Sequence, residues 1–172
     1  MKRLRIFLVG LVLLAVLGMA WLWKGYESEI LSSHTFVEIN APADKAWAVL
    51  TDLASYPQWN PYVVTATGTL KEGEKLRIIE EFDGRRRSHA VLVTRFDPQE
   101  RQLIWVGSTT PSILLKWGEW FGIEPIDANH SRLTVANSNQ GLLAWLYWKY
   151  NKTRDLQVYR SFGSAFKKKV EE

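Results

Sequence analysis

Residues 36–62 of the chain read FVEINAPADKAWAVLTDLASYPQWNPY, and this stretch decides the fold. The opening FVEI favours an extended strand, because β-branched and aromatic residues fit a pleated sheet. Pro42 supplies a fixed φ that suits the first turn of a helix. Apolar residues then recur at helical spacing, at Ala43, Ala46, Trp47 and Leu50. The stretch therefore predicts a strand followed by a helix with one apolar face.

The end of this helix is predicted at two proline pairs, Tyr56-Pro57 and Asn60-Pro61. A residue before proline is pushed out of the α region, so each pair interrupts a helix. Together with Trp59, these residues predict an aromatic turn that leads into the next strand.

The order of these elements resembles the opening of the START/Bet v 1-like superfamily, in particular its bacterial polyketide cyclase/dehydrase and lipid-transport branch. The residues that carry the resemblance are Ala41, Pro42, Trp47, Leu50, Asp52, Tyr56, Pro57, Trp59, Asn60 and Pro61. The resemblance implies a helix-grip fold, in which a curved sheet wraps a terminal helix and leaves a cavity between them.

The N-terminus has a different composition from the rest of the chain. Lys2, Arg3 and Arg5 precede Ile6–Trp23, which contains no charged residue. Eighteen residues of helix span roughly 27 Å, close to the hydrocarbon thickness of a bilayer. We therefore predict a single transmembrane anchor and short linker over residues 1–30, with the N-terminus cytoplasmic and the domain, residues 31–172, on the periplasmic side of the cell membrane. The alternative is a cleaved signal peptide ending near Ala20.

The charge of the remaining domain is nearly balanced. Residues 31–172 contain eighteen Lys and Arg against sixteen Asp and Glu. A nucleic-acid partner is disfavoured, because such proteins carry a basic stripe. The chain has no cysteine, which excludes disulfides and thiolate chemistry.

Seven strands are predicted from short apolar runs between turn signals. They span 35–40, 63–70, 76–82, 88–96, 102–108, 114–126 and 132–139, and Asp83-Gly84 is the strongest hairpin signal. Residues 142–170 are predicted to form a helix, because apolar residues recur there at helical spacing. They form one apolar stripe at Leu156, Tyr159, Phe162, Phe166 and Val170. The predicted fold class is α+β: a seven-stranded curved antiparallel sheet around a long C-terminal helix, preceded by one transmembrane helix.

Candidate catalytic groups are few, since the chain contains no nucleophile elbow, phosphate loop or zinc-protease motif. Strand alternation carries Glu119 to the face that the resemblance places inward, and Glu80 shares a face with Ile78 and Phe82. A carboxyl group in an apolar cavity has a raised pKa and can act as an acid or base. The alternative is that each carboxylate lies in water near the cavity mouth or pairs with an arginine such as Arg77. His89 is the third candidate, and the direction of its side chain is left open by the pattern.

Cavity-lining residues follow from the resemblance, from strand phase and from the helix stripe. The candidates are Trp105, Trp117, Glu119, Phe121, Ile123, Leu133, Asn137, Tyr159, Phe162 and Phe166. Inward tryptophans would form a flat apolar wall with an occasional N–H donor, which suits a lipid or aromatic ligand. The alternative for these rings is ordinary core packing. The resemblance implies that many relatives carry an acid where Asn137 stands, and an amide cannot exchange protons at neutral pH.

The run LLAWLYWKY at 142–150 is apolar nearly all round. Such a helix is either buried or in contact with a membrane surface. We therefore predict a membrane rim at Trp145, Tyr147 and Trp148, with a place in the cavity wall or in the core as the alternative.

The function indicated is membrane-anchored binding or transfer of a lipophilic small molecule in the cavity. The first alternative is a cyclase- or dehydratase-type enzyme that uses Glu119, Glu80 or His89 on a hydrophobic substrate. The second is a protein that binds an unknown protein partner through the aromatic rim. We predict no metal site and no cofactor.

Overall fold

The computed structural model describes residues 2, 5, 7, 9–14, 16–18 and 31–172. Among these residues, no helix combines the length and the apolar character that crossing a bilayer requires. The predicted membrane-spanning segment includes residues 6, 8, 15 and 19–23, which lie outside the described part of the chain. The anchor therefore stays a prediction.

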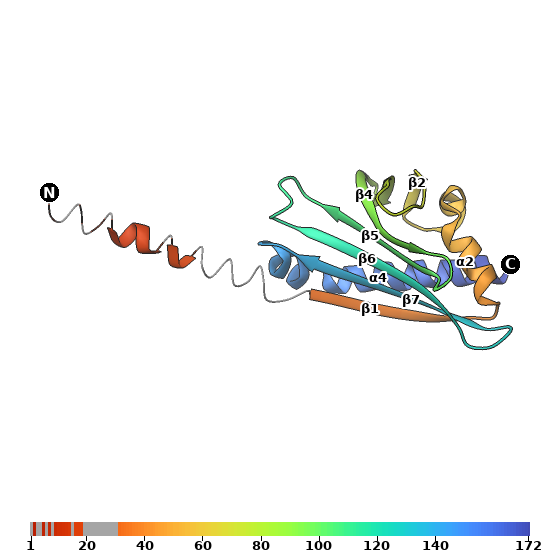
Figure 1. Cartoon of the computed structure of the whole chain (residues 1–172). Helices are drawn as coiled ribbons and strands as arrows, with labels where there is room; N and C mark the ends of the chain where they lie inside the picture. Colours follow the sequence, from red (N-terminus) through yellow and green to blue (C-terminus); the bar gives the residue numbers. More distant parts are fainter. Residues whose placement is uncertain (1, 3–4, 6, 8, 15, 19–30) are drawn as a thin grey trace.

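Seven antiparallel strands form one curled sheet in the order β1-β7-β6-β5-β4-β3-β2 (Figure 1). From β2 to β7 each strand pairs with the next in sequence, and β1 pairs with β7. The strands are β1 (Leu31–Ile39), β2 (Val63–Thr67), β3 (Lys75–Phe82), β4 (Arg85–Asp97), β5 (Gln102–Ser108), β6 (Lys116–Pro125) and β7 (Ser131–Gln140). The predicted seven-stranded antiparallel sheet is confirmed.

The strand boundaries differ from the predicted ones where pairing or a glycine decides them. β1 begins at Leu31, four residues before its predicted start, because its first residues pair with the end of β7. β2 ends at Thr67 because Gly68 has a positive φ and its backbone lies against the carbonyl of Lys75. β4 begins directly after the predicted Asp83-Gly84 turn, where both residues have positive φ.

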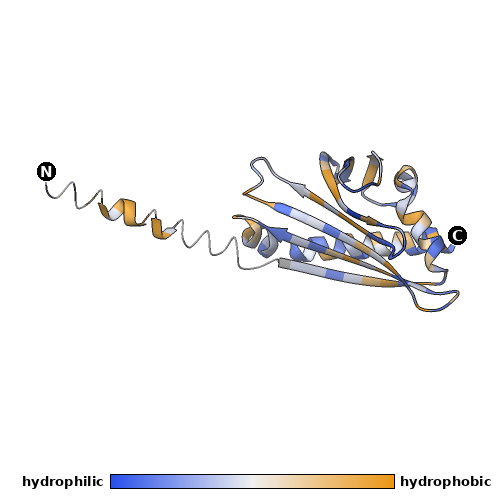
Figure 2. Cartoon of the chain, in the orientation of Figure 1, coloured by the Kyte–Doolittle hydropathy of each residue, from blue (hydrophilic) through white to orange (hydrophobic). Residues whose placement is uncertain are grey.

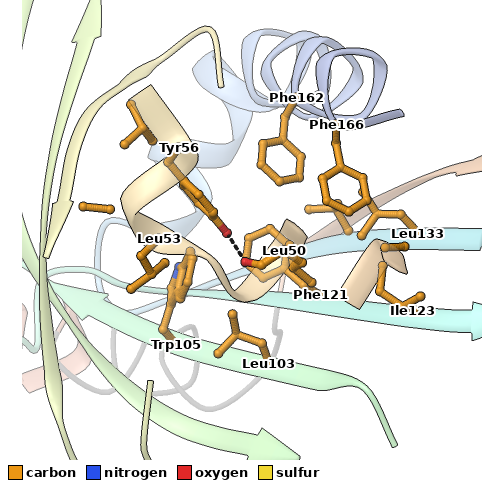
Figure 3. Packing of buried hydrophobic residues seen from close by; sticks show 14 of the residues in the cluster. Leu50, Leu53, Tyr56, Leu103, Trp105, Phe121, Ile123, Leu133, Phe162 and Phe166 are labelled. Atoms are coloured by element: carbon orange, nitrogen blue, oxygen red, sulfur yellow. Dashed lines mark hydrogen bonds between the residues drawn. The ribbon is translucent and has the colours of Figure 1, made fainter. Parts of the chain in front are cut away.

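Three short helices connect β1 to β2. They are α2 (Ala43–Thr51), the 3₁₀ turn η1 (Leu53–Ser55) and α3 (Tyr56–Trp59). The predicted aromatic turn is thus a helical turn, because Pro57 fits the start of a helix, where no N–H is needed. The buried hydroxyl of Tyr56 donates to the carbonyl of Leu50 over 2.7 Å and ties α3 to α2 (Figure 3).

The long helix α4 (Ala144–Glu171) crosses the concave face of the sheet (Figure 1). Polar and apolar residues alternate along it, as expected of a helix with one apolar stripe (Figure 2). Phe162, Phe166 and Val170 of this stripe are buried. Trp59 packs on Phe162 and Phe166, with ring centroids 5.4 and 5.5 Å apart. With Tyr56 and Phe121, these three rings form an aromatic cluster that we call the distal core. Figure 3 labels Tyr56, Phe121, Phe162 and Phe166 of this cluster.

The two ends of the sheet carry different features. At the proximal end lie the start of β1, the β5–β6 loop and the first turns of α4 (Figure 1). By strand register, the β3–β4 hairpin belongs to the same end of the strands. At the distal end lie α2 and the last turn of α4, where Glu171 accepts a hydrogen bond from the backbone of Asn40 over 2.7 Å. The chain therefore enters the domain at the proximal end.

Candidate functional site

A cavity of about 720 Å³ lies between the inner face of the sheet and residues 147–159 of α4. Strands β3, β4, β6 and β7 each contribute alternate side chains to its wall, because every second residue of a strand faces inward. The lining includes Glu80, Arg85, Arg87, His89, Leu115, Trp117, Glu119, Asn137, Asn139, Tyr147, Asp155, Val158 and Tyr159. The wall is thus a mixture of charged, amide and aromatic groups.

The cavity opens between the β3–β4 hairpin and α4. Asp83, Arg85 and Arg87 of the hairpin line the cavity and are exposed, as is Arg154 on the facing helix. Arginine side chains at a mouth attract anionic groups and present several N–H donors in a fixed plane. The mouth is therefore cationic, whereas the carboxylates lie farther in.

Glu119 is held at the cavity floor by two donors. Trp105 Nε1 donates to Glu119 Oε2 over 2.6 Å, and the Tyr159 hydroxyl donates to Oε1 over 3.1 Å. The first contact follows from the register, since Trp105 and Glu119 are direct cross-strand partners on β5 and β6. Burial raises the pKa of Glu119, and the hydrogen bonds from Trp105 and Tyr159 offset part of that rise.

Glu80 and His89 form a second polar pair in the wall. His89 Nδ1 lies 3.9 Å from Glu80 Oε2, and the imidazole ring meets the edge of Trp117. Burial, with a further contribution from the charge of Glu119 and an opposing one from Arg87, raises the pKa of Glu80 to about 7. Burial lowers the pKa of His89. Near neutral pH the pair therefore holds a partly protonated carboxyl group beside a neutral imidazole.

Two asparagines of β7 supply amide groups at neighbouring inward positions. Asn137 Oδ1 accepts a hydrogen bond from the backbone of Ser33 over 3.1 Å. Asn139 is only 2% exposed, and its Nδ2 has no hydrogen-bond partner among the residues that the structure describes. Leaving such a donor unpaired costs about 1–3 kcal/mol. A ligand oxygen would satisfy it.

Helix α4 adds a third set of polar side chains to the cavity wall. The Tyr147 hydroxyl and Arg154 Nη2 each lie 3.5 Å from Asp155 Oδ1, at the limit of hydrogen bonding. Burial raises the pKa of Asp155, and the charge of Arg154 opposes that rise. The helix therefore places a carboxylate and a phenol opposite the two amides of β7.

A smaller pocket of about 50 Å³ lies beyond Glu119, toward the distal core. Its walls include Trp105, Phe121 and Phe162, together with Tyr56, and Glu80, Glu119 and Tyr159 line it as well as the large cavity. The Trp105–Glu119–Tyr159 hydrogen bonds thus stand between an outer chamber and an inner apolar one.

The predicted site residues fall into four groups. Glu80, His89, Trp117, Glu119, Asn137 and Tyr159 line the large cavity. Trp105, Phe121 and Phe162 line the inner pocket. Ile123 and Phe166 differ from the prediction, because they are packed in the core and line none of the hollows found. Leu133 lines a separate groove of about 260 Å³ beside Gly163, between β1, β7 and α4.

Several cavity residues were not predicted. Asn139 is two residues from Asn137 and shares its face, so strand phase alone could have identified it. Arg85 and Arg87 lie on the same face of β4 as His89. Because His89 points inward with Val91, strand alternation places both arginines on the cavity side as well. Asp155 lies four residues before Tyr159 on one helix face, a spacing that was available in the sequence.

The predicted membrane rim divides between two faces of α4. Trp145 is exposed, as predicted for a rim residue. Tyr147 instead faces the cavity, and Trp148 is partly covered, with its Nε1 buried and Lys152 Nζ 4.4 Å from its ring centroid.

Sequence comparison assigns the chain to a family. Residues 31–144 match the family described as polyketide cyclase / dehydrase and lipid transport. The chain belongs to this family, and with it to the START/Bet v 1-like superfamily, also called SRPBCC. The domain is therefore of the hydrophobic-ligand-binding or cyclase type. Among curated protein sequences, none matches the chain significantly.

Solved structures share the fold at low identity. The di-domain aromatase/cyclase BexL superposes with a TM-score of 0.68 at 19% identity over 83% of this chain, which spans about half (47%) of BexL. A START superfamily protein from Mycobacterium smegmatis gives 0.65 at 20% identity, covering 81% of this chain and 97% of that one. Norcoclaurine synthase from Thalictrum flavum, in complex with dopamine and hydroxybenzaldehyde, gives 0.63 at 14% identity over 83% and 87% of the two chains. At these identities the likeness establishes the fold alone.

Proposed function

We propose that this domain binds a lipophilic small molecule that also carries polar groups, in the cavity between the sheet and α4. The observation that carries the proposal is a cavity of about 720 Å³ whose wall contains a buried amide, Asn139, that has no hydrogen-bond partner in the described part of the chain. Ligand pockets in proteins commonly measure about 300–1,000 Å³. Burial of the ligand's apolar surface would supply about 25 cal/mol per Å².

The polar groups of the wall restrict the class of ligand. Asn139 Nδ2 requires an acceptor oxygen, such as a carbonyl or hydroxyl group. Trp117 and Val158 offer apolar contact, and the arginines at the mouth suit an anionic substituent. A purely hydrocarbon ligand would leave these groups without partners, so we expect an amphiphilic molecule.

The same proposal includes a membrane location. Residues 1–30 would anchor the domain, and the basic residues at its start would keep the N-terminus in the cytoplasm, with the domain on the periplasmic side. Support comes from the uncharged run Ile6–Trp23. A fusion to a reporter that is active only outside the cytoplasm would test it, and a signal from a cytoplasmic reporter would contradict it.

Native mass spectrometry of the full chain, purified gently from source cells, tests the binding function. We expect one retained species at near-stoichiometric amount. Asn139→Leu should lose most of that species while the free energy of unfolding stays equal or rises, because an unpaired buried amide is removed. Gln157→Leu, which changes an exposed amide of α4, is the matched control and should retain the species. A wild-type protein that is empty and takes up no lipophilic probe would contradict the proposal.

A second candidate function is an acid–base enzyme acting on a hydrophobic substrate in the same cavity. The observation that favours it is the Glu80–His89 pair, which can accept and return a proton near neutral pH. Incubation of the extracted ligand with wild-type protein should then produce a dehydrated species, visible as the mass loss of one water, or a cyclised isomer of equal mass, visible by its chromatographic retention. Glu80→Gln should abolish the product and Glu74→Gln, in an exposed turn, should not. An unchanged ligand would exclude this function for that molecule.

A further inference from the structure

The first turns of α4 expose a run of large apolar side chains on one face. Trp145 is 60%, Leu146 46% and Tyr150 73% exposed. Leu146 and Tyr150 are four residues apart and therefore neighbours on the helix surface. Lys149 lies over the rings of both Trp145 and Tyr150, so the three side chains border one patch. Scattered exposed apolar residues are ordinary, but a contiguous patch that contains two aromatic rings marks an interaction surface.

The β5–β6 loop extends this patch. Ile113 and Leu143 are also exposed. The carbonyl of Ile113 accepts a hydrogen bond from Leu142 N over 3.1 Å, and that of Leu114 accepts one from Leu143 N over 2.9 Å. The loop is thus fixed to the start of α4. We call the surface made by Ile113, Leu143, Trp145, Leu146 and Tyr150 the docking face.

One lysine lies between the two aromatic rings of the docking face. Lys149 Nζ lies 5.0 Å from the Trp145 ring centroid and 5.7 Å from that of Tyr150. Long lysine side chains can lie along apolar surface and keep their charge in water, at the level of lipid headgroups. Aromatic residues mixed with lysine on one helix face are typical of helices that lie in the membrane interface.

The position of the docking face in the fold matches a membrane partner. It lies at the proximal end, where the chain enters β1, and the uncharged run Ile6–Trp23 ends only seven residues before that strand. The β3–β4 hairpin at the same end carries Arg85, Arg86 and Arg87. A surface that combines apolar side chains with a basic surround is complementary to an anionic bilayer.

On these grounds we propose that the docking face binds an anionic lipid surface directly, in addition to any anchoring by residues 1–30. Trp145, Leu146 and Tyr150 enter the headgroup region, and Lys149 and Lys152 pair with lipid phosphates. Tyr147 and Arg154, on the other side of the same helix segment, line the cavity. Docking therefore brings the cavity mouth to the lipid surface, where an amphiphilic ligand is available. The inference stands independently of which ligand the cavity holds.

Vesicle co-sedimentation of residues 31–172 tests this proposal without the N-terminal segment. Among the residues that the structure describes, the buried core lies between Ile39 and Val170, so we expect residues 31–172 to fold without the N-terminal segment. We expect the domain to bind phosphatidylcholine vesicles that contain phosphatidylglycerol, and to bind pure phosphatidylcholine vesicles more weakly. Trp145→Ser/Tyr150→Ser should reduce binding to both by tenfold or more. Lys149→Glu/Lys152→Glu should reduce only the binding that depends on phosphatidylglycerol.

The control is Phe36→Ser, which removes an apolar ring of similar exposure, 64%, from β1. It should leave vesicle binding unchanged. A wild-type domain that stays in the supernatant, or an equal loss of binding in the Phe36 variant, would overturn the proposal. So would self-association through this face, seen as a dimer that Trp145→Ser/Tyr150→Ser converts to a monomer without any vesicle binding.

The absence of cysteine from the chain allows a second readout. Leu146→Cys, labelled with a polarity-sensitive fluorophore, should shift to the blue when anionic vesicles are added. The same label at Lys168→Cys, exposed near the distal end of the same helix, should not shift. Equal shifts at both positions would show nonspecific adsorption and contradict docking by this face.

Discussion

The distal and proximal halves of α4 face the same sheet but meet different surroundings. In the distal half, Phe162 and Phe166 pack on Trp59 and Phe121 and leave little space. In the proximal half, the residues facing inward are Tyr147, Asp155 and Tyr159, and a cavity of about 720 Å³ remains. The sheet shows the same division, since the amides of Asn137 and Asn139 on β7 line only the proximal cavity, and the carboxyl groups of Glu80 and Glu119 lie at its border with the small inner pocket.

This division indicates that one end of the domain provides stability and the other provides a site. A closely packed aromatic cluster contributes dispersion and hydrophobic burial. Buried carboxyl groups and an unpaired amide lower stability, and they remain where a ligand can interact with them. The separation can be tested by substitutions that should affect one half and leave the other intact.

Phe166→Ala should have the largest effect on stability. Phe166 is fully buried in the distal core, and truncation of such a ring costs about 3–5 kcal/mol of unfolding free energy. Urea denaturation of the domain measures the loss. Phe36→Ala, at an exposed position, should change the same quantity by less than about 0.5 kcal/mol. A small loss for Phe166→Ala would show that the distal core is not the main source of stability.

Two glycine substitutions should separate stability from cavity shape. A Cβ at Gly107, on the inner face of β5, would lie 2.3 Å from the Trp117 ring, and one at Gly122, on the outer face of β6, would lie 2.6 Å from Trp120. Each alanine should cost about 1–3 kcal/mol through overpacking. Only Gly107→Ala moves a ring of the cavity, so only it should weaken uptake of a lipophilic fluorescent probe. Equal effects on uptake would contradict the cavity as its site.

Much of the fold follows from sequence because its signals are local. The Pro42 start, the helical spacing after it and the Asp83-Gly84 turn each act within a few residues, and β5 has the predicted bounds. The apolar stripe of α4 also predicted which side faces the sheet. These signals determine where helices and strands lie and which of their faces are buried. They do not determine how closely two buried faces approach each other.

The composition of the cavity was less predictable for that reason. Phe162 and Phe166 occupy equivalent places on the stripe, yet only Phe162 borders a pocket. The Trp105–Glu119–Tyr159 hydrogen bonds join β5, β6 and α4, so they depend on the register of β5 and β6 and on the position of the helix. Contacts between distant segments of this kind have no signature within one window of sequence.

Substitution of two tyrosines by phenylalanine gives a matched pair of variants with a smaller expected effect on the unfolding free energy. Tyr56→Phe removes the donor to the buried Leu50 carbonyl and should cost about 1–2 kcal/mol of unfolding free energy, because that acceptor stays unpaired. Tyr159→Phe removes a donor to Glu119 beside the cavity, where water can replace it, and should cost less than about 1 kcal/mol. Urea denaturation measures both. A reversed order would show that the Glu119 hydrogen bonds, and not the distal core, dominate stability.

The smallest expected effect is a pH dependence of stability that originates in the cavity. The raised pKa of Glu80, about 7 against 4.5 in an ordinary setting, means that the folded state holds a proton more tightly than the unfolded chain. Stability from this group is therefore greatest at low pH and falls as pH rises from about 4.5 to about 7. Solvent in the open cavity screens the effect. We therefore expect Glu80→Gln to reduce the pH-dependent change in unfolding free energy by about 1 kcal/mol. The measurement is the unfolding free energy as a function of pH for the wild type and for Glu80→Gln. Subtracting one curve from the other removes the contributions of His89 and the surface carboxylates, which both proteins share. Identical curves would show that Glu80 ionises as in water. The proximal half would then lack a carboxyl group with a pKa near neutrality, on which the acid–base alternative depends.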